Sequence, residues 1–484
     1  MNSGTELNTT WWTRPCGGRE VLAVALPLVI SAGSWSLMHF VDRMFLLWHD
    51  TEAMAASMPA GLTHFMLLCF PLGLATYVNT FVAQYNGAGR PERIGLAVWQ
   101  GVRIGLWVTP LFVLLVPVAP YLFAAAGHHP KLAALESIYF QTLCFGAGAA
   151  VMSGALASFF TGRGQTRVVM VVDCCASLMN IVLDYLWIFG RLGFPEMGIE
   201  GAGWATAVSQ WFKMLVYWWL MMRPVHVERY GLATGKRFDA ALMWRLIRFG
   251  SPNGLQMFVE VAAFTIFNLL VGALGPMAMA ATTLAFNVNS VAWVPMIGMG
   301  IAVATLVGQQ LGRNRPDLAA RATWTAFWMS TAYMGLMALV YVAVPGLLLL
   351  GHKAGTTPEQ FDALHDLTVL LLRFVAVYCL FDAMNMIFVS ALKGAGDMRF
   401  VLLSTMVVSP MPVLAVWIGV RYFDLGLLWS WGVVTAWITA LGVIYLARFL
   451  QGRWKTMRVI ESELPVEPTP APPEPAVAMG GESL

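Results

Sequence analysis

The sequence predicts an all-α integral membrane protein, with 12 transmembrane helices arranged as two parallel six-helix repeats. The first observation is composition: 58% of the 484 residues are hydrophobic and only 11% are charged, whereas soluble proteins carry about 25% charged residues. The second is a set of apolar stretches long enough to span a bilayer, which takes about 20 residues. The third is an internal repeat that relates the two halves of the chain.

The repeat is visible as two pairs of motifs. Residues 81–92 read FVAQYNGAGRPE and residues 306–317 read LVGQQLGRNRPD, with five identities at an offset of 225. A Gly-x-Gly-x-x-Arg motif begins at Gly162 and recurs at Gly394, at an offset of 232. Many membrane carriers place a substrate path between duplicated halves, so the repeat favours a transport function.

The predicted spans are divided equally between the two halves. Because six is an even number, the second half enters the membrane from the same side as the first, and the repeats are related by an axis along the membrane normal. Several stretches exceed 25 residues, which indicates tilted helices or helices that extend past the bilayer. The predicted spans are 20–48, 55–83, 96–126, 134–160, 168–190, 200–222, 246–274, 280–309, 322–350, 364–392, 400–422 and 427–450.

Lysine and arginine gather on one side of the predicted membrane. The N-terminal tail, the segments after the even-numbered spans and the span ends beside them (Arg248 and Arg448) carry 21 of them, against four on the opposite side. This asymmetry places both termini in the cytoplasm. The first residues lack the order of charged, apolar and small residues typical of a cleavable signal, so we expect the first apolar stretch to be retained.

The spans and their connections define five regions. We expect a cytoplasmic N-terminal tail (1–19), an N-lobe (20–222), a basic cytoplasmic linker (223–245), a C-lobe (246–450) and a Pro-rich cytoplasmic tail (451–484). The composition of the last region is typical of disordered segments.

Charge and cysteine usage exclude several kinds of protein. A net charge of only +3 argues against a nucleic-acid partner. Five of the six cysteines lie in apolar stretches without metal-ligand spacing, and buried reduced thiols are the interpretation that fits. The histidines also lack the spacing of a metal site. We therefore expect no cofactor, no enzymatic activity, and a monomer whose main partner is the lipid bilayer.

Four acidic residues lie inside predicted spans: Asp42, Asp184, Glu260 and Asp382. An ionisable group in the membrane costs several kcal/mol unless it is paired or hydrated, so each acid is a functional candidate. The alternatives are structural: an ion pair or interfacial position for Asp42, and a polar contact that joins two helices for Asp184.

Neighbouring polar residues strengthen two of these candidates. Asn180 precedes Asp184 by four residues, so amide and carboxylate share one helical face and can supply oxygens to a proton or cation. Tyr378 precedes Asp382 by the same spacing, and ring and carboxylate can hold a cation together. Glu260 stands alone among apolar residues, where a carboxylate can exchange a proton.

Other charged residues in the spans have structural interpretations. Asp173 lies near a helix N-terminus, where it favours the helix dipole and can contact Arg167. Arg103 and Arg373 are close enough to helix ends to reach the interface. Lys213 lies nearer the middle of its span and is a candidate partner for an acid of the N-lobe.

Seven segments in order carry a resemblance to a known family. They are LPLVIS…VDRMFLL, Gln84-x-x-Gly87, GRGQTR, NIVLDYLWIFG with MGIEGAGWAT, GSPNGLQMFVEVAAF, LVGQQLGRNRP and FDAMNMIFVSALKGAGDMR. Over residues 20–450 the chain resembles multidrug and toxic compound extrusion (MATE) transporters, and within them the NorM-like bacterial branch.

The resemblance implies a V-shaped pair of lobes around a central cavity, in the inner membrane of a bacterium. It implies export of organic cations in exchange for inward Na+ or H+, and the pattern of acids does not choose between the two ions. It further implies a hinge at Pro27 and a Na+ position at Glu260, Tyr378 and Asp382. The implied ion-coupling and substrate residues are Asp42, Asn180, Asp184, Thr206, Glu260, Tyr378 and Asp382.

Three other functions remain open from the sequence. A flippase for a lipid-linked precursor, from the same superfamily, needs a cavity rich in basic residues, whereas the buried charges here are acids. A membrane-embedded transferase needs a nucleophile and base or a metal cluster, which the sequence does not show. Major facilitator carriers also repeat a loop motif after spans 2 and 8, but with a denser acid and arginine pattern.

Overall fold

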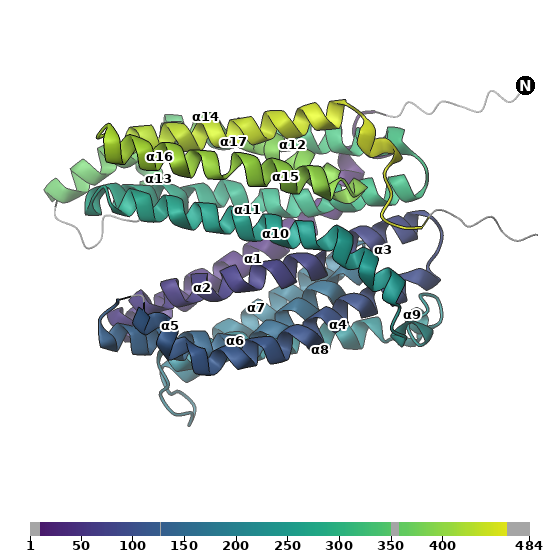
Figure 1. Cartoon of the computed structure of the whole chain (residues 1–484), viewed down its shortest axis with the longest axis horizontal. Coiled ribbons are helices and arrows are strands. Elements are labelled where there is room, and N and C mark those ends of the chain that lie inside the picture. The colour runs from purple at the N-terminus through teal and green to yellow at the C-terminus, as the bar shows by residue number, and fades with distance from the viewer. Residues whose placement is uncertain (1–9, 126, 350–357, 462–484) are drawn as a thin grey trace, which may run out of the picture.

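The computed structural model describes residues 10–125, 127–349 and 358–461. Within these residues the chain forms α-helices and short 3-10 helices, with no strand. Figure 1 shows two helical bundles, one from each half of the chain, that meet at one side and diverge toward the other. We call the side where the described chain begins and ends the termini side. The predicted fold class is confirmed.

The N-lobe contains the first six spans. Two predicted spans are divided: the second bends at Tyr77, and the third passes through a 3-10 turn at Val116–Val118. The helices are α1 (Gly18–His49), α2 (Thr51–Thr76), α3 (Val78–Gly87), α4 (Glu92–Leu115), α5 (Ala119–Ala125), α6 (Pro130–Thr161), α7 (Thr166–Ile188) and α8 (Ile199–Met221).

The linker and the C-lobe follow. Asp239 caps the first long helix of the C-lobe by accepting from the backbone N–H of Leu242 at 2.9 Å, which satisfies a free donor of the first turn. That helix therefore begins at Ala240, earlier than the predicted boundary at 246. The helices are α9 (Pro224–Val227), α10 (Ala240–Gly272), α11 (Pro276–Gly312), α12 (Pro316–Ala343), α13 (Pro345–Leu349), α14 (Pro358–Ala395), α15 (Met398–Val408), α16 (Pro410–Tyr422) and α17 (Leu427–Leu450).

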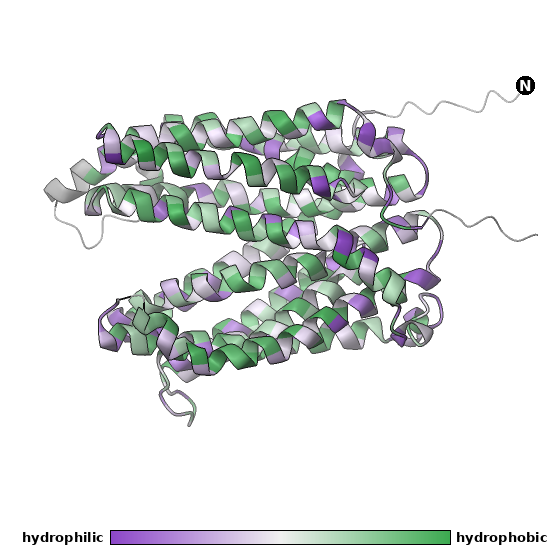
Figure 2. Ribbon diagram, in the orientation of Figure 1, coloured by the Kyte–Doolittle hydropathy of each residue, from purple (hydrophilic) through white to green (hydrophobic). Residues whose placement is uncertain are grey.

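The lipid-facing surface is apolar. Figure 2 shows hydrophobic residues along both bundles and many hydrophilic residues in the turns at their ends. Eleven helical segments among the described residues are long and apolar enough to cross a membrane. The predicted sixth span, α8, is also a helix of 23 residues, but Glu200 and Lys213 make it less apolar. The protein is therefore a multi-pass membrane protein.

Close packing between the lobes follows the sequence repeat. A methyl group built on Gly73 of α2 would lie 2.6 Å from the Cα of Gly254 in α10, and one built on Gly298 of α11 would lie 2.5 Å from the backbone nitrogen of Val29 in α1. Gly298 follows Gly73 by 225 residues, and Gly254 follows Val29 by the same number. The two contacts are thus repeat-related, and glycine permits the close approach of the helices in both.

The start of the predicted C-terminal tail is packed against the protein. Residues 453–456 form a 3-10 helix, and the buried Trp454 ring stacks on Phe449 with centroids 4.8 Å apart. Val459 and Ile460 are also buried. The predicted disordered tail therefore cannot begin at 451, because these side chains bury apolar surface. The Pro-rich stretch beyond residue 461 lies outside the described residues.

Candidate functional site

The two acids of the N-lobe lie on α1 and α7, which pack together. Asp42 is 4% exposed and Asp184 is fully buried. The hydroxyl of Tyr139 on α6 donates to Oδ2 of Asp42 at 3.4 Å, and the two carboxylates interact electrostatically. Oδ1 of each acid has no hydrogen-bond partner among the described residues, so both carboxylates retain an acceptor for a ligand.

Asn180 and Thr206 complete this group. In the amide orientation that satisfies its neighbours, the Asn180 nitrogen donates to Oδ2 of Asp184 at 3.0 Å, and its oxygen accepts from the Thr206 backbone N–H at 3.2 Å. The structure thus brings Asn180, Asp184 and Thr206 together through α7 and α8.

The acids of the C-lobe lie on α10 and α14. The side-chain amide of Gln256, one turn before Glu260 in α10, donates to Oε1 of Glu260 at 2.8 Å. Asp382 is buried in α14, hydrogen-bonds with Asn385 and interacts electrostatically with Glu260. Tyr378, also buried, interacts electrostatically with Asp382.

None of the four acids forms an ion pair within the described parts of the chain. Asp173 differs from them. Its carboxylate pairs with Lys213 at 2.9 Å, accepts from Tyr217 at 2.8 Å and accepts from Ser31 of α1. Lys213 therefore pairs with an N-lobe acid, and Asp173 contacts Lys213 where the sequence indicated Arg167.

The four acids lie on the side of the lobe contacts that is away from the termini. Glu260 follows Gly254 by six residues along α10, which is about 9 Å at 1.5 Å per residue. Asp42 follows Val29 by 13 residues along α1, about 20 Å. Both lobes thus carry acids beyond the level at which glycine contacts join them.

Sequence reasoning missed three polar neighbours of the acids. Gln256 and Asn385 lie within one turn of Glu260 and Asp382, so their spacing was a usable signal. Tyr139 lies on a different span from Asp42, and no local pattern indicated that contact. The predicted hinge, Pro27, is buried within α1, which continues through it. Among the described residues, no cluster of three or more His, Cys, Asp or Glu side chains forms a metal site.

Two repeated six-helix bundles, joined on one side and carrying buried acids in both halves, define a class of protein: a polytopic membrane transporter. The MatE family model matches residues 27–186 and 252–418, more than half of the chain. The chain belongs to the MATE family of transporters. It is 30% identical over 382 residues to a probable multidrug resistance protein NorM from Xanthomonas axonopodis pv. citri (strain 306), covering 78% of this chain and 81% of that protein.

Solved structures show the same fold. One is an outward-facing multidrug resistance MATE transporter of the MOP superfamily, with a TM-score of 0.83 at 19% identity over 94% of this chain and all of the other. Another is the eukaryotic MATE transporter AtDTX14, with a TM-score of 0.79 at 17% identity over 90% of this chain and 96% of the other.

Proposed function

We propose that the protein is a secondary active exporter that moves organic cations out of the cell against inward H+ or Na+. The observation that carries this proposal is a set of four carboxylates in membrane-spanning helices, three of them buried, that form no ion pair within the described residues. A buried acid without a basic partner is costly, and an exchangeable cation offsets that cost. The protein acts without a cofactor, as a monomer in the inner membrane of a bacterium, with both termini in the cytoplasm.

Coupling arises from competition for the carboxylates. With the termini in the cytoplasm, the lobes are joined on the cytoplasmic side, and the acids lie toward the outside. There a proton or Na+ neutralises a carboxylate and favours release of the organic cation. The loaded carrier then turns inward, loses the ion and rebinds substrate. This cycle requires that ion and substrate bind the two states with different affinities.

Each lobe supplies one group of ligands. In the N-lobe, Asp42 and Asp184 hold the exchangeable cation, with Asn180 and Thr206 orienting Asp184, and Pro27 allows α1 to bend because proline removes one helical hydrogen bond.

In the C-lobe, Glu260 and Asp382 provide carboxylate oxygens and Tyr378 a phenolic oxygen. These are the hard oxygen donors that a Na+ ion prefers.

Reconstitution into liposomes tests the proposal. Ethidium movement is followed under an imposed proton gradient and then under an imposed sodium gradient. We expect transport under one gradient, and loss of transport in Asp42→Asn and Asp382→Asn. Asp317→Asn, which removes an exposed charge on the termini side, is the control and should transport normally. Normal export by both site variants would contradict the proposal.

A lipid-linked precursor flippase is the alternative. No ethidium movement under either gradient, by folded protein, would favour it. The same vesicles then test translocation of a fluorescent lipid-linked pyrophosphate, which a flippase moves and a cation exporter does not.

A further inference from the structure

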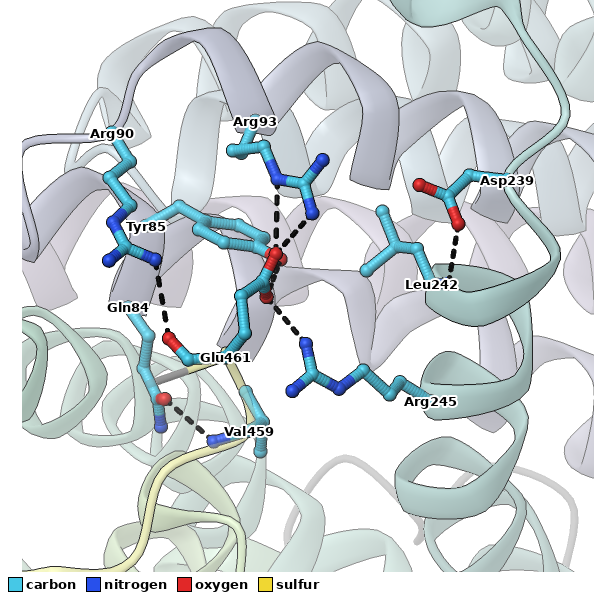
Figure 3. A network of polar contacts seen from close by, with 9 residues as sticks. All are labelled: Gln84, Tyr85, Arg90, Arg93, Asp239, Leu242, Arg245, Val459 and Glu461. Carbon is cyan, nitrogen blue, oxygen red and sulfur yellow. Dashed lines mark hydrogen bonds and ion pairs between the residues drawn. The ribbon is translucent and has the colours of Figure 1, made fainter. Parts of the chain in front are cut away.

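The segment after α17 crosses the boundary between the lobes on the termini side (Figure 3). The carboxylate of Glu461 accepts from the Tyr85 hydroxyl at 2.7 Å, from Nε of Arg93 at 3.1 Å and from Nη1 of Arg245 at 2.5 Å. Tyr85 and Arg93 belong to the N-lobe, on α3 and α4, whereas Arg245 lies on α10 of the C-lobe. One carboxylate therefore bridges the two lobes.

Backbone contacts hold the same segment in place. The backbone N–H of Val459 donates to the side-chain oxygen of Gln84 at 2.9 Å. Arg90 donates from Nη1 to the backbone carbonyl of Glu461 at 3.2 Å. The Val459 side chain is buried and packs at Gly396, where an added methyl group would lie 2.7 Å from it. The segment is thus bound at defined positions on both lobes.

Charge complementarity is strong at Glu461. Its side chain is 25% exposed, so water screens the arginines only in part. Burial alone would raise the pKa of Glu461, but the hydrogen bonds from Tyr85 and Arg93 lower it to about 2. Charge-assisted hydrogen bonds of this kind are about twice as strong as neutral ones.

The bridge breaks the symmetry of the repeat. After the first six spans the chain folds back onto its own lobe: the N–H of Gly95 in α4 donates to the Tyr230 carbonyl at 3.0 Å, and Trp99 donates to the Leu232 carbonyl at 3.0 Å. After the second six spans, residues 457–461 instead reach the opposite lobe. The crossing is therefore specific to the C-terminal segment.

We propose that Tyr85, Arg93 and Arg245 form a carboxylate-binding site for the chain's own Glu461, and that residues 457–461 act as a releasable latch between the lobes. When the lobes separate on the termini side, Glu461 must leave the arginine of one lobe. The latch thereby favours the state in which this side is closed. Its role as a switch rests on the alternating cycle proposed above.

Distance measurements by pulsed spin-label spectroscopy test the latch. The labels replace Arg229 in the linker and Arg399 at the start of α15, both exposed, in a variant whose six native cysteines are replaced. We expect Glu461→Gln to raise the ratio of separated to closed populations about tenfold, as loss of one charge-assisted bond predicts. Glu228→Gln, the same change at an exposed linker residue, should leave the ratio unchanged. Equal distributions in the two variants would overturn the proposal.

The two arginines provide an independent test. Glu461 follows α17 of the C-lobe, so its contact with Arg93 of the N-lobe is the one that separation breaks. Arg93→Gln should shift the population in the same direction as Glu461→Gln and should not add to that shift, because both act through one carboxylate, whereas Arg245→Gln should shift it less. Additive shifts, or no shift from Arg93→Gln, would overturn the proposal. The distances require no transported compound, so a failed transport assay leaves this result intact.

Discussion

The side-chain amide of Gln84 donates to the backbone carbonyl of Gly394 across the lobe boundary, at 3.1 Å. The repeat-related pair does the same in reverse, because Gln309 donates to the carbonyl of Gly162 at 2.8 Å. The two motifs that recur in the sequence are therefore the two halves of one interface. In each half, the glutamine at the end of the second span donates to the glycine at the end of the fourth span of the opposite half.

Replacing these glutamines should weaken closure of the termini side unequally. Gln309→Ala removes the bond to Gly162 and should lower the stability of the closed state by about 1–2 kcal/mol. Gln84→Ala removes the bond to Gly394 and also the acceptor for the Val459 N–H. It should therefore lower the stability of the closed state by about 1–2 kcal/mol more than Gln309→Ala does. The distance distribution between labelled lobes measures both effects. Equal shifts would show that the Val459 contact contributes nothing.

Contacts within one helix were predictable from the sequence, whereas contacts between distant segments were not. The spacing of Asn180 and Asp184 places both on one face, and the structure brings them together. Composition and the repeat were sufficient for the fold class because membrane spans are long and apolar.

The bridge of Glu461 depends on residues more than 200 positions away, and no local pattern encodes such a contact. Composition also placed the start of the disordered tail too early, at residue 451. Two or three buried side chains in a short segment do not change the average composition of the tail. The partner of Lys213 was open for the same reason, since several acids of the N-lobe were available to it.

Glycine at the lobe boundary should be irreplaceable where backbones touch. A methyl group on Gly312 would collide with the Gln84 carbonyl oxygen, so we expect Gly312→Ala to destabilise the closed state by about 1–3 kcal/mol. Gly432 in α17 has open space around it, and Gly432→Ala should be neutral or stabilising by up to about 1 kcal/mol. Distance distributions and unfolding temperatures in detergent distinguish the two. A neutral Gly312→Ala would mean that the lobes can slide apart without cost.

The Asp173 cluster should behave as a structural unit of the N-lobe. Asp173→Ala removes three contacts, two to α8 and one to α1, and should cost about 2–3 kcal/mol of stability, with a smaller cost for Lys213→Ala. The double variant should cost less than the sum, by about 1 kcal/mol, because the two residues share one interaction. Thermal unfolding of the parent protein, the two single variants and the double variant measures this difference. Strict additivity would indicate that the ion pair contributes nothing by itself.

The latch should be insensitive to pH in the range where a proton-coupled carrier works. The pKa of Glu461 is about 2 in the latched state, below its ordinary value of about 4.3. The stabilisation that Glu461 gives to the latched state is therefore complete at pH values above the ordinary pKa, and it is lost as the pH falls toward the pKa of the latched state. The shift caused by Glu461→Gln should therefore be the same at about pH 5.5 and about pH 8. Comparing Glu461→Gln with the parent protein at each pH separates the effect of the latch on the populations from the effect of titrating the membrane acids. A shift that disappears at the lower pH would contradict the prediction.

The acids do not follow the repeat that builds the scaffold. At the offset of 225, the position related to Asp42 is Phe267, and the position related to Glu260 is Trp35. The interface glycines and glutamines are thus repeat-related, while each lobe carries its own set of acids. The repeat therefore accounts for the contacts that close the lobes, but not for the positions of the acids.

Neutralising an unpaired acid should stabilise the protein while it stops transport. Asp184 is fully buried, and its Oδ1 has no partner among the described residues, so its charge costs free energy that Asn would not incur. We expect Asp184→Asn to raise the unfolding temperature in detergent by a few degrees, since about 1 kcal/mol shifts the midpoint of a chain this size by about 2–4 °C or less. Ethidium export should fall at least about tenfold, as the variant can no longer exchange a cation at this position.

Asp173→Asn is the matched control, because Asp173 lies on the same helix and is paired with Lys213. The unfolding temperature of Asp173→Asn should fall. If Asp184→Asn also lowers the unfolding temperature, the carboxylate holds the helices together, and the structural interpretation of Asp184 replaces the functional one.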